Sequence, residues 1–282
     1  MLKFCTKIPS YRFISMTRFL YLLLLFPMLV NAQDPSLNIY DEKNEESVTV
    51  FADNTALFPF TVLISIQYEG LKPTKPIAET AVVYGKAEKV VLAQFTVPKN
   101  RSWKISYNFQ YMEGDIKAVH DDSYGYRLPF KAGKSYSMTQ GYNGPFTHQG
   151  VNALDFTMPN GEAVVAARGG IIVKVKENSN RGCPSSKCIN DSNYIRILHE
   201  DGTMAEYHHL QRNGALVNEG DSVTRGQTIG KCGDTGFVSG PHLHFIVFKT
   251  DGLKQIGIKT KFEYADGKIG LLETRKKYTA FE

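Results

Sequence analysis

Two histidines that stand one residue apart, His242 and His244 in "GPHLHF", are the first candidates for chemistry. On a β-strand, residues i and i+2 point to the same face, so both imidazoles are expected to project into one space. This arrangement suits a metal site, or a site in which one histidine binds metal and the other transfers protons. Two surface histidines on an ordinary strand are the alternative.

The other histidines offer further ligands. Six of the seven lie at or beyond residue 148, and His120 is the exception. Zinc takes about four ligands, and a catalytic zinc leaves one position for water, so histidines plus a carboxylate are the expected set. In "AEYHHL", strand alternation predicts that only one of His208 and His209 faces a common site. His199, next to a turn, is interpreted as structural, and His120, in a linker, as structural or solvated.

Three cysteines remain beyond the first 32 residues: Cys183, Cys188 and Cys232. Cys183 and Cys188 bracket the short turn-like stretch "PSSK", and an oxidising compartment favours a disulfide between them. A zinc site formed by these two cysteines and nearby histidines is the alternative. Cys232 is predicted to be a lone thiol.

Residues 1–32 have the pattern of a secretory signal peptide. Basic residues precede the apolar run "FLYLLLLFPMLV", and Val30 and Ala32 fit a cleavage site after Ala32. Removal of four of the 33 basic residues and none of the 28 acidic ones leaves a net charge of +1. This balance does not support nucleic-acid binding. We expect an exported chain, periplasmic or extracellular, without a transmembrane anchor after cleavage.

The elements that must position these residues are predicted to be β-strands throughout. In "FTVLISIQY" (60–68) and "WKISYNFQY" (103–111), apolar residues alternate, and "SVTVF" and "KVVLAQFTV" indicate further strands. Breaks rich in Gly, Pro and Asn separate them. Residues 33–130 are therefore predicted to form a small β-sandwich.

Residues 131–252 are predicted to form a second, antiparallel β domain, followed by a tail at 253–282. Its strands are expected in "GIIVKVKE", "NYIRILHE", "TMAEYHHL", "SVTRGQTIG" and "PHLHFIVFK", with glycines at the joints and one more strand, "KTKFEYA", in the tail. The fold class is thus all-β.

Residues 140–250 resemble the LytM/lysostaphin-type zinc metallopeptidases. The resemblance rests on "HQG…LDFTMPNGEAVVAARGGIIVKV", "DGTMAEYHHL" and "GDSVTRGQTIGKCGDTGFVSGPHLHF", which occur in the family's order. It implies one Zn²⁺ held by His148, Asp155 and His244, with His209 and His242 as catalytic partners. The resemblance leaves open which of these two histidines is the base.

The spacing of the first two ligands departs from the family pattern. Six residues separate His148 from Asp155, where the family motif has three, and Asn152 occupies the position of the usual spacing. Pro159 and Gly161 follow Asp155 at the family's distances, which favours Asp155 and a three-residue insertion. Because the separation is odd, the insertion is expected to bulge so that both side chains reach one metal.

The resemblance implies an exported endopeptidase that hydrolyses peptide bonds of peptidoglycan with a zinc-activated water. The alternative is a non-catalytic module of the same fold that binds cell wall or regulates an amidase. The linker "DDSYGYRLPFKAGKSY" (121–136) is also a candidate plug for the cleft.

Overall fold

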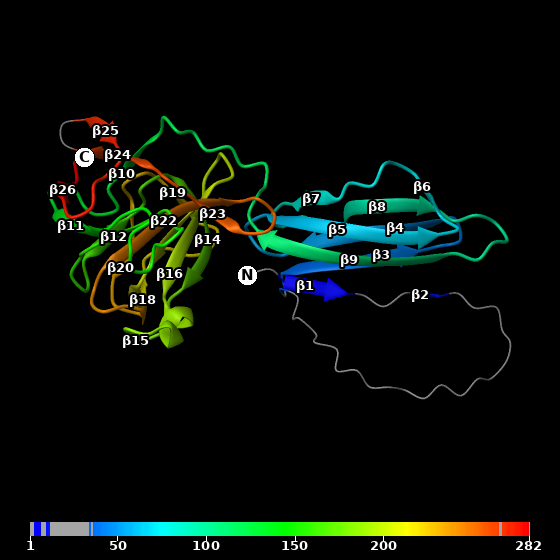
Figure 1. Ribbon diagram of the computed structural model, residues 1–282, viewed down its shortest axis with the longest axis horizontal. Helices are drawn as coiled ribbons and strands as arrows, with labels where there is room; N and C mark the ends of the chain where they lie inside the picture. The colour runs from blue at the N-terminus through cyan, green and yellow to red at the C-terminus, as the bar shows by residue number, and fades with distance from the viewer. Residues whose placement is uncertain (1–2, 7–9, 12–33, 35, 265–266, 282) are drawn as a thin grey trace. The chain divides into compact units, whose positions relative to one another are not determined.

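The computed structural model describes residues 3–6, 10–11, 34, 36–264 and 267–281 and is almost entirely β (Figure 1). This confirms the predicted fold class. The one helix in the described ranges is a short 3₁₀ helix, η1 (Ser186–Asp191). No helix in that part of the chain is long and apolar enough to cross a membrane. The apolar run of the predicted signal lies outside the described residues.

The chain forms two compact units. Unit 1 comprises Met1–Glu113 with Gly252–Lys254, and unit 2 comprises Gly114–Asp251 with Gln255–Glu282. The domain limits inferred from the sequence, 33–130 and 131–252, stay predictions.

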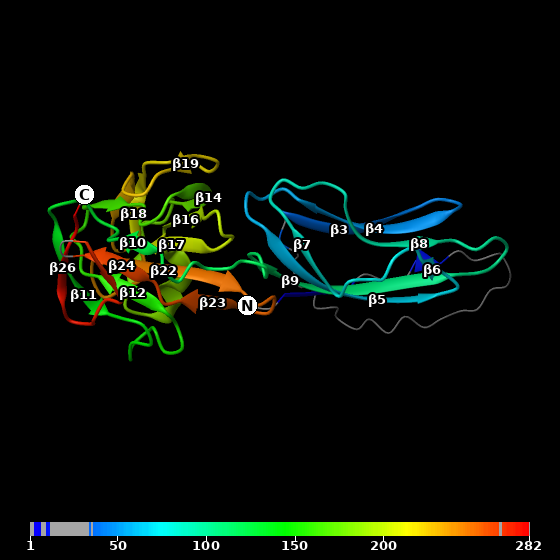
Figure 2. The same cartoon turned by 90° about the horizontal axis from the view of Figure 1, so that it is seen from above.

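Unit 1 is a sandwich of two sheets, seen as two layers in Figure 2. One sheet has the order β3-β4-β8-β6, with bounds β3 (Leu37–Lys43), β4 (Ser47–Asn54), β8 (Val90–Thr96) and β6 (Lys72–Pro73). The other has the order β1-β9-β5-β7, with β2 also on β9; the bounds are β1 (Lys3–Thr6), β2 (Ser10–Tyr11), β9 (Lys104–Glu113), β5 (Phe60–Glu69) and β7 (Thr80–Val83). Alternate apolar residues such as Val50, Val62 and Phe109 are buried between the sheets, as the sequence alternation predicts.

Unit 2 is built on a nine-stranded sheet in which neighbouring strands are antiparallel. Its order is β19-β14-β16-β17-β22-β12-β11-β26, with β23 also on β22. The bounds are β19 (Ser222–Val223), β14 (Gly170–Lys176), β16 (Tyr194–Leu198), β17 (Met204–His208), β22 (Leu243–Thr250), β12 (Ala153–Phe156), β11 (Ser135–Gln140), β26 (Lys277–Thr279) and β23 (Gln255–Ile258).

Three smaller sheets complete unit 2. They are β13 (Ala163–Val165), β20 (Thr228–Cys232) and β18 (Leu210–Ala215); β10 (Gly125–Arg127), β24 (Lys261–Tyr264) and β25 (Lys268–Gly270); and β15 (Gly182–Cys183) with β21 (Gly236–Phe237). The predicted single strand "SVTRGQTIG" is wrong: Gly226 has a φ of 87°, and the chain turns there between β19 and β20.

Candidate metal centre

The floor of the site is a polar row that crosses adjacent strands of the large sheet. The strand register pairs His244 on β22 with Asp155 on β12 and with His208 on β17. Because side chains alternate along a strand, the chain neighbours of these three residues form a second row on the opposite face of the sheet. That row is apolar and fully buried: Leu154, Phe245 and Tyr207. The core on one face therefore fixes the polar row on the other.

His148, Asp155 and His244 come together as one cluster that could hold a metal ion. The His148 Nε2 atom lies 3.1 Å from His244 Nδ1 and 3.3 Å from Asp155 Oδ1, and the last two atoms are 2.9 Å apart. Tetrahedral zinc with bonds of ~2.05 Å needs ligand atoms roughly 3.3 Å apart. Two imidazoles and one carboxylate at these separations fit zinc.

Neighbouring groups orient two of these side chains. The His148 Nδ1–H donates to the Gly141 carbonyl at 3.0 Å, which leaves a lone pair on Nε2 for a metal. The Gln140 side-chain amide donates to Asp155 Oδ2 at 2.7 Å, so Oδ1 is the oxygen that faces the two histidines. Such outer contacts fix the orientation of metal ligands.

The role of Gln140 was not anticipated from the sequence, because it depends on a β-bulge. Regular alternation would place Gln140 on the same face as Met138, which is buried in the core opposite Phe156. The register shifts between Met138 and Gln140, and Gln140 lies opposite Asp155 instead. The extra residue turns the side chain onto the cleft face.

The insertion before Asp155 lies in a loop and does not bulge from a strand. β12 begins only at Ala153, so the parity of the separation from His148 places no constraint on the ligands. The Asn152 side chain points to a different partner and donates to the Gly257 carbonyl at 2.8 Å. Asn152 is not part of the metal-binding cluster.

His209 and His242 lie side by side next to this cluster, with ring centroids 4.6 Å apart. The Nδ1–H of His209 donates to the Thr235 carbonyl at 2.7 Å, and that of His242 donates to the Gly240 carbonyl at 2.9 Å. A carbonyl can only accept, so in each neutral ring the Nε2 atom carries the lone pair. Each histidine therefore has a basic nitrogen available to the cleft.

The expectation that only one of His208 and His209 faces the site is wrong. Both line the cleft. β17 ends at His208, and His209 has a φ of +66°, a left-handed conformation that is uncommon outside glycine. This conformation breaks the alternation that the prediction assumed.

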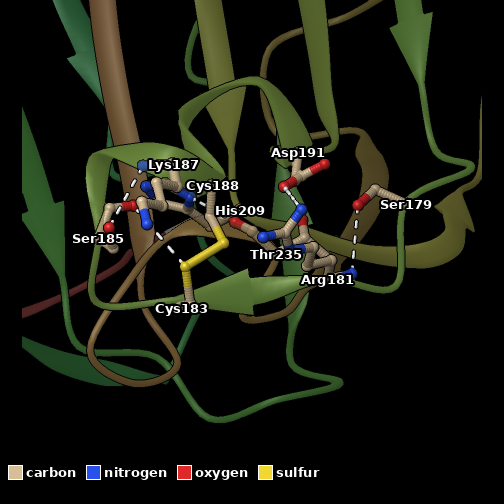
Figure 3. The surroundings of a disulfide bond; sticks show 9 residues. All are labelled: Ser179, Arg181, Cys183, Ser185, Lys187, Cys188, Asp191, His209 and Thr235. Carbon is tan, nitrogen blue, oxygen red and sulfur yellow. Dashed lines mark hydrogen bonds and ion pairs between the residues drawn. A yellow bond between two sulfur atoms is a disulfide. The ribbon is translucent and has the colours of Figure 1, made fainter.

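The cleft has a volume of about 700 Å³, and its lining includes Phe146, Pro184, Ile189, Phe237 and Val238. Pro184 and Ile189, on one wall, belong to the segment in which the disulfide between Cys183 and Cys188 ties β15 to η1 (Figure 3). This disulfide is the pairing that the sequence favours for these two cysteines. Figure 3 also shows His209 and Thr235 among the residues that surround the disulfide.

Burial and opposite charge shift the pKa values within the cluster. Burial would raise the pKa of Asp155, but hydrogen bonds and charges of His148 and His244 hold it far below its ordinary value. Burial would lower the pKa of His148, but the hydrogen bond to Asp155 and the charge of Asp155 outweigh burial. The pKa of His148 is therefore raised. Burial, together with the charges of the neighbouring histidines, lowers the pKa of His209 well below 6.5. His209 is thus held neutral.

The other candidates lie outside the cleft lining. His199 is buried, and its Nδ1–H donates to the Gly169 carbonyl, while His120 contacts Asp122 and the Tyr126 hydroxyl. Cys232 is a buried free thiol. Of the candidate plug at 121–136, Tyr126, Leu128 and Phe130 are part of the core of unit 2. In the structure described, this segment does not line the cleft.

Comparison with known proteins places these residues in a family. Residues 147–255 match the model of peptidase family M23. Residues 147–255 form an M23 peptidase domain. This confirms the resemblance to LytM/lysostaphin-type enzymes.

Relatives match over part of this chain. The peptidoglycan DD-endopeptidase ShyA of Vibrio cholerae is 38% identical over 94 residues, which are 33% of this chain and 19% of ShyA. Lysostaphin of Staphylococcus staphylolyticus is 35% identical over 130 residues, 45% of this chain and 24% of lysostaphin. This chain thus spans less than a quarter of either relative.

Among solved structures, the catalytic domain of lysostaphin from Staphylococcus simulans is 31% identical. The match covers 40% of this chain and 78% of that domain, with a TM-score of 0.31.

Proposed function

We propose that this protein is an exported zinc endopeptidase that hydrolyses peptide bonds in peptidoglycan. The observation that carries the proposal is the cluster of His148, Asp155 and His244, which could hold a metal ion, with His209 and His242 in the lining of the adjoining cleft. The peptidoglycan endopeptidases among the relatives support the substrate class. The predicted signal over residues 1–32 and the Cys183–Cys188 disulfide support export.

His148 Nε2, Asp155 Oδ1 and His244 Nδ1 are the atoms that would hold the zinc ion. Zinc bound there would supply Lewis-acid polarisation of the scissile carbonyl and acidify a water molecule. The carboxylate of Asp155 is ionised over the physiological pH range, because both histidines lower its pKa. The protein therefore presents an anionic ligand without having to lose a proton first.

His209 and His242 are proposed to handle protons. Peptide hydrolysis needs a base that accepts a proton from the attacking water and an acid that protonates the departing amine. The Nε2 atoms of both rings are suited to this, because each Nδ1–H is committed to a backbone carbonyl. Burial keeps His209 neutral and able to accept a proton. Either ring, once protonated, can also donate to the developing negative oxygen.

The test is digestion of purified, cross-linked peptidoglycan by the chain from residue 33 to 282. Products are identified by mass spectrometry, with a chelated sample and a sample to which zinc is restored. We expect cross-linked dimers to disappear, the chelator to stop the reaction and zinc to restore it. Tight peptidoglycan binding without cleavage, from protein that contains no zinc, would instead support the non-catalytic module.

Two variants test whether Asp155, and not Asn152, is the zinc ligand. Asp155→Asn removes the anionic ligand, and we expect it to lower zinc affinity by at least ~100-fold, since even outer contacts of ligands are worth 10- to 100-fold. Asn152→Ala removes the bonds to the Gly257 carbonyl and from the Asn143 side chain, neither of which involves the metal-binding cluster, and should retain one zinc per chain and full cleavage. Loss of zinc from Asn152→Ala but not from Asp155→Asn would reverse the assignment.

A further inference from the structure

His208 occupies the polar row of the cleft floor, yet the proposed ligands and proton carriers do not include it. Its ring lies between those of Tyr194 and His244, with centroid distances of 4.9 and 5.6 Å. His208 Nε2 lies 2.7 Å from Glu206 Oε2, and Nδ1 lies 3.2 Å from the Ser192 hydroxyl. Both ring nitrogens are therefore bound by the protein.

Behind His208 is a buried ion pair. Glu206 Oε1 accepts from Arg196 Nε at 2.7 Å and from Arg196 Nη2 at 2.6 Å, across the register of β16 and β17. Burial alone would raise the pKa of Glu206, but the charge of Arg196 and the bond from His208 lower it, so it stays ionised. A buried ion pair usually stabilises a fold no more than apolar residues of similar size would. Stability alone therefore does not explain why Arg196 and Glu206 are here.

The Arg196–Glu206 pair determines which groups donate and which accept in the hydrogen bonds from His208 to Ser192 and His209. An ionised Glu206 can only accept, so the His208 Nε2–H donates to it. In the neutral ring, Nδ1 is then an acceptor, and the Ser192 hydroxyl can donate to it at 3.2 Å or to the Asn193 carbonyl at 3.3 Å. The lone pairs of Ser192 Oγ are left for the backbone N–H of His209, which donates to it at 3.2 Å.

That last bond supports the unusual backbone of His209. A non-glycine residue with a φ of +66° is strained and persists where its surroundings hold it. Three contacts hold His209: its N–H donates to Ser192 Oγ, its Nδ1–H donates to the Thr235 carbonyl, and Nδ1 also lies 3.4 Å from Ser192 Oγ. If Ser192 is displaced, only the Thr235 carbonyl still holds the ring, and regular alternation would turn it away from the cleft.

We propose that His208 is a positioning residue that acts through Ser192 to hold the left-handed backbone of His209 and so aim its ring into the cleft. Glu206 and Arg196 fix the tautomer of His208 that this requires. The inference rests on the proposed function of His209 as a proton carrier, but its structural half can be tested separately.

The structural half is tested by amide hydrogen exchange. His208→Leu keeps a side chain of comparable bulk but cannot accept from Ser192. We expect the amide of residue 209 to exchange about 10-fold faster in this variant, while the amides of Met204–Tyr207 in β17 keep their rates. His208→Asn places an acceptor near the position of Nδ1 and should restore most of the protection. Unchanged exchange at residue 209 in His208→Leu overturns the inference, whether or not the chain is an enzyme.

The kinetic half is tested by a double-mutant cycle on peptidoglycan cleavage. We expect His208→Leu to lower kcat by about 10-fold with KM within twofold, and His208→Asn to recover most of this. In a His209→Ala background, His208→Leu should cause no further loss, because residues that act as one unit are not additive. Additive losses would show that His208 acts independently of His209 and would overturn the inference.

A charge-matched pair of variants provides the control. Glu206→Gln weakens the anchor of His208 and should also lower kcat by about 10-fold. Glu263→Gln makes the same change in the ion pair with Arg225, away from the cleft lining, and should leave kcat unchanged. If the wild-type chain shows no chelator-sensitive cleavage, the proposed function fails, and the exchange measurements alone decide the positioning role.

Discussion

At the scale of single residues, the two oxygens of Asp155 have separate tasks. Oδ1 faces His148 and His244, and Oδ2 is held by Gln140. The carbonyl oxygen of the Gln140 side chain also accepts from the backbone N–H groups of Phe146 and Thr147. One amide thus joins the orientation of a ligand to the loop that carries His148.

We expect Gln140→Leu to lower zinc affinity by about 10-fold or more, because the ligand carboxylate and the loop both lose a partner. A competition titration against a fluorescent zinc chelator measures the change. Gln149→Leu is the control: Gln149 is exposed in the same loop, and its side chain donates only to the Pro145 carbonyl among the contacts observed. Equal zinc affinities for Gln140→Leu and wild type would exclude this role.

The residues of the candidate site that the sequence predicts lie on regular strands or in motifs of the family that the chain resembles. Asp155 and His244 are implied by the resemblance to the family, and the strand register brings them opposite each other. The sequence does not reveal that Gln140 faces the cleft, nor that both His208 and His209 do. The reason is the same in both cases. A bulge in β11 and a left-handed residue after β17 each reverse the face of a side chain, and neither leaves a glycine or proline as a signal.

At the scale of elements, the fold class and most strands follow from apolar alternation, because the sheets bury one face against a core. Pairing partners do not follow from it: β10 and β24 pair in parallel although more than 130 residues separate them. Alternation states which face is buried but not which strand lies next to it. The same limit applies to η1, whose six residues are too few to show an apolar period.

The element with the clearest link to the cleft is the disulfide-closed segment of β15 and η1. Pro184 and Ile189 belong to it and line the cleft, and Ser192 follows it directly. The Cys183–Cys188 bond closes a short loop, for which chain entropy predicts a contribution of about 2 kcal/mol. Reduction should therefore loosen one wall of the cleft.

We expect reduction of the wild-type disulfide to raise KM for peptidoglycan fragments about 3- to 10-fold, since ordering a side chain on binding costs about 1 kcal/mol. The measurement compares steady-state kinetics with and without reductant. Cys183→Ser/Cys188→Ser should have the raised KM in both conditions and so controls for effects of reductant on the metal. A wild-type KM that does not respond to reduction would contradict this view of the wall.

At the scale of the whole molecule, unit 2 is closed by segments from both of its ends. β24 pairs with β10, and β26 pairs with β11. Phe262 of β24 is fully buried, and its ring contacts those of Tyr126, Phe156 and Phe245. The tail that follows the M23 match therefore belongs to the same core as the cleft floor.

We expect Phe262→Ala to lower the free energy of unfolding by about 3–5 kcal/mol, the usual result of truncating a buried phenylalanine. Urea unfolding measures this. Phe281→Ala removes the same atoms from an exposed position in the same tail and should change stability by less than about 0.5 kcal/mol. A small effect of Phe262→Ala would mean that the tail is not needed to close the core.

His199 makes the stability of unit 2 depend on pH. Burial lowers its pKa from 6.5 to about 4, and the nearby charge of Arg168 acts in the same direction, while the bond to the Gly169 carbonyl opposes it. The unfolded chain therefore takes up a proton below pH 6.5 that the folded chain refuses until about pH 4. It follows that the free energy of unfolding falls as the pH drops through this window.

From the two pKa values, the contribution of His199 to this fall between pH 7 and pH 5 is about 2 kcal/mol. His199→Asn keeps a donor near the position of Nδ1 for the Gly169 carbonyl but does not titrate. We expect its free energy of unfolding to drop by about 2 kcal/mol less than that of wild type over the same range. Urea unfolding at both pH values, with chelator present so that zinc binding does not contribute, measures the difference. Identical drops for the two proteins would show that His199 is already protonated in the folded chain at pH 5.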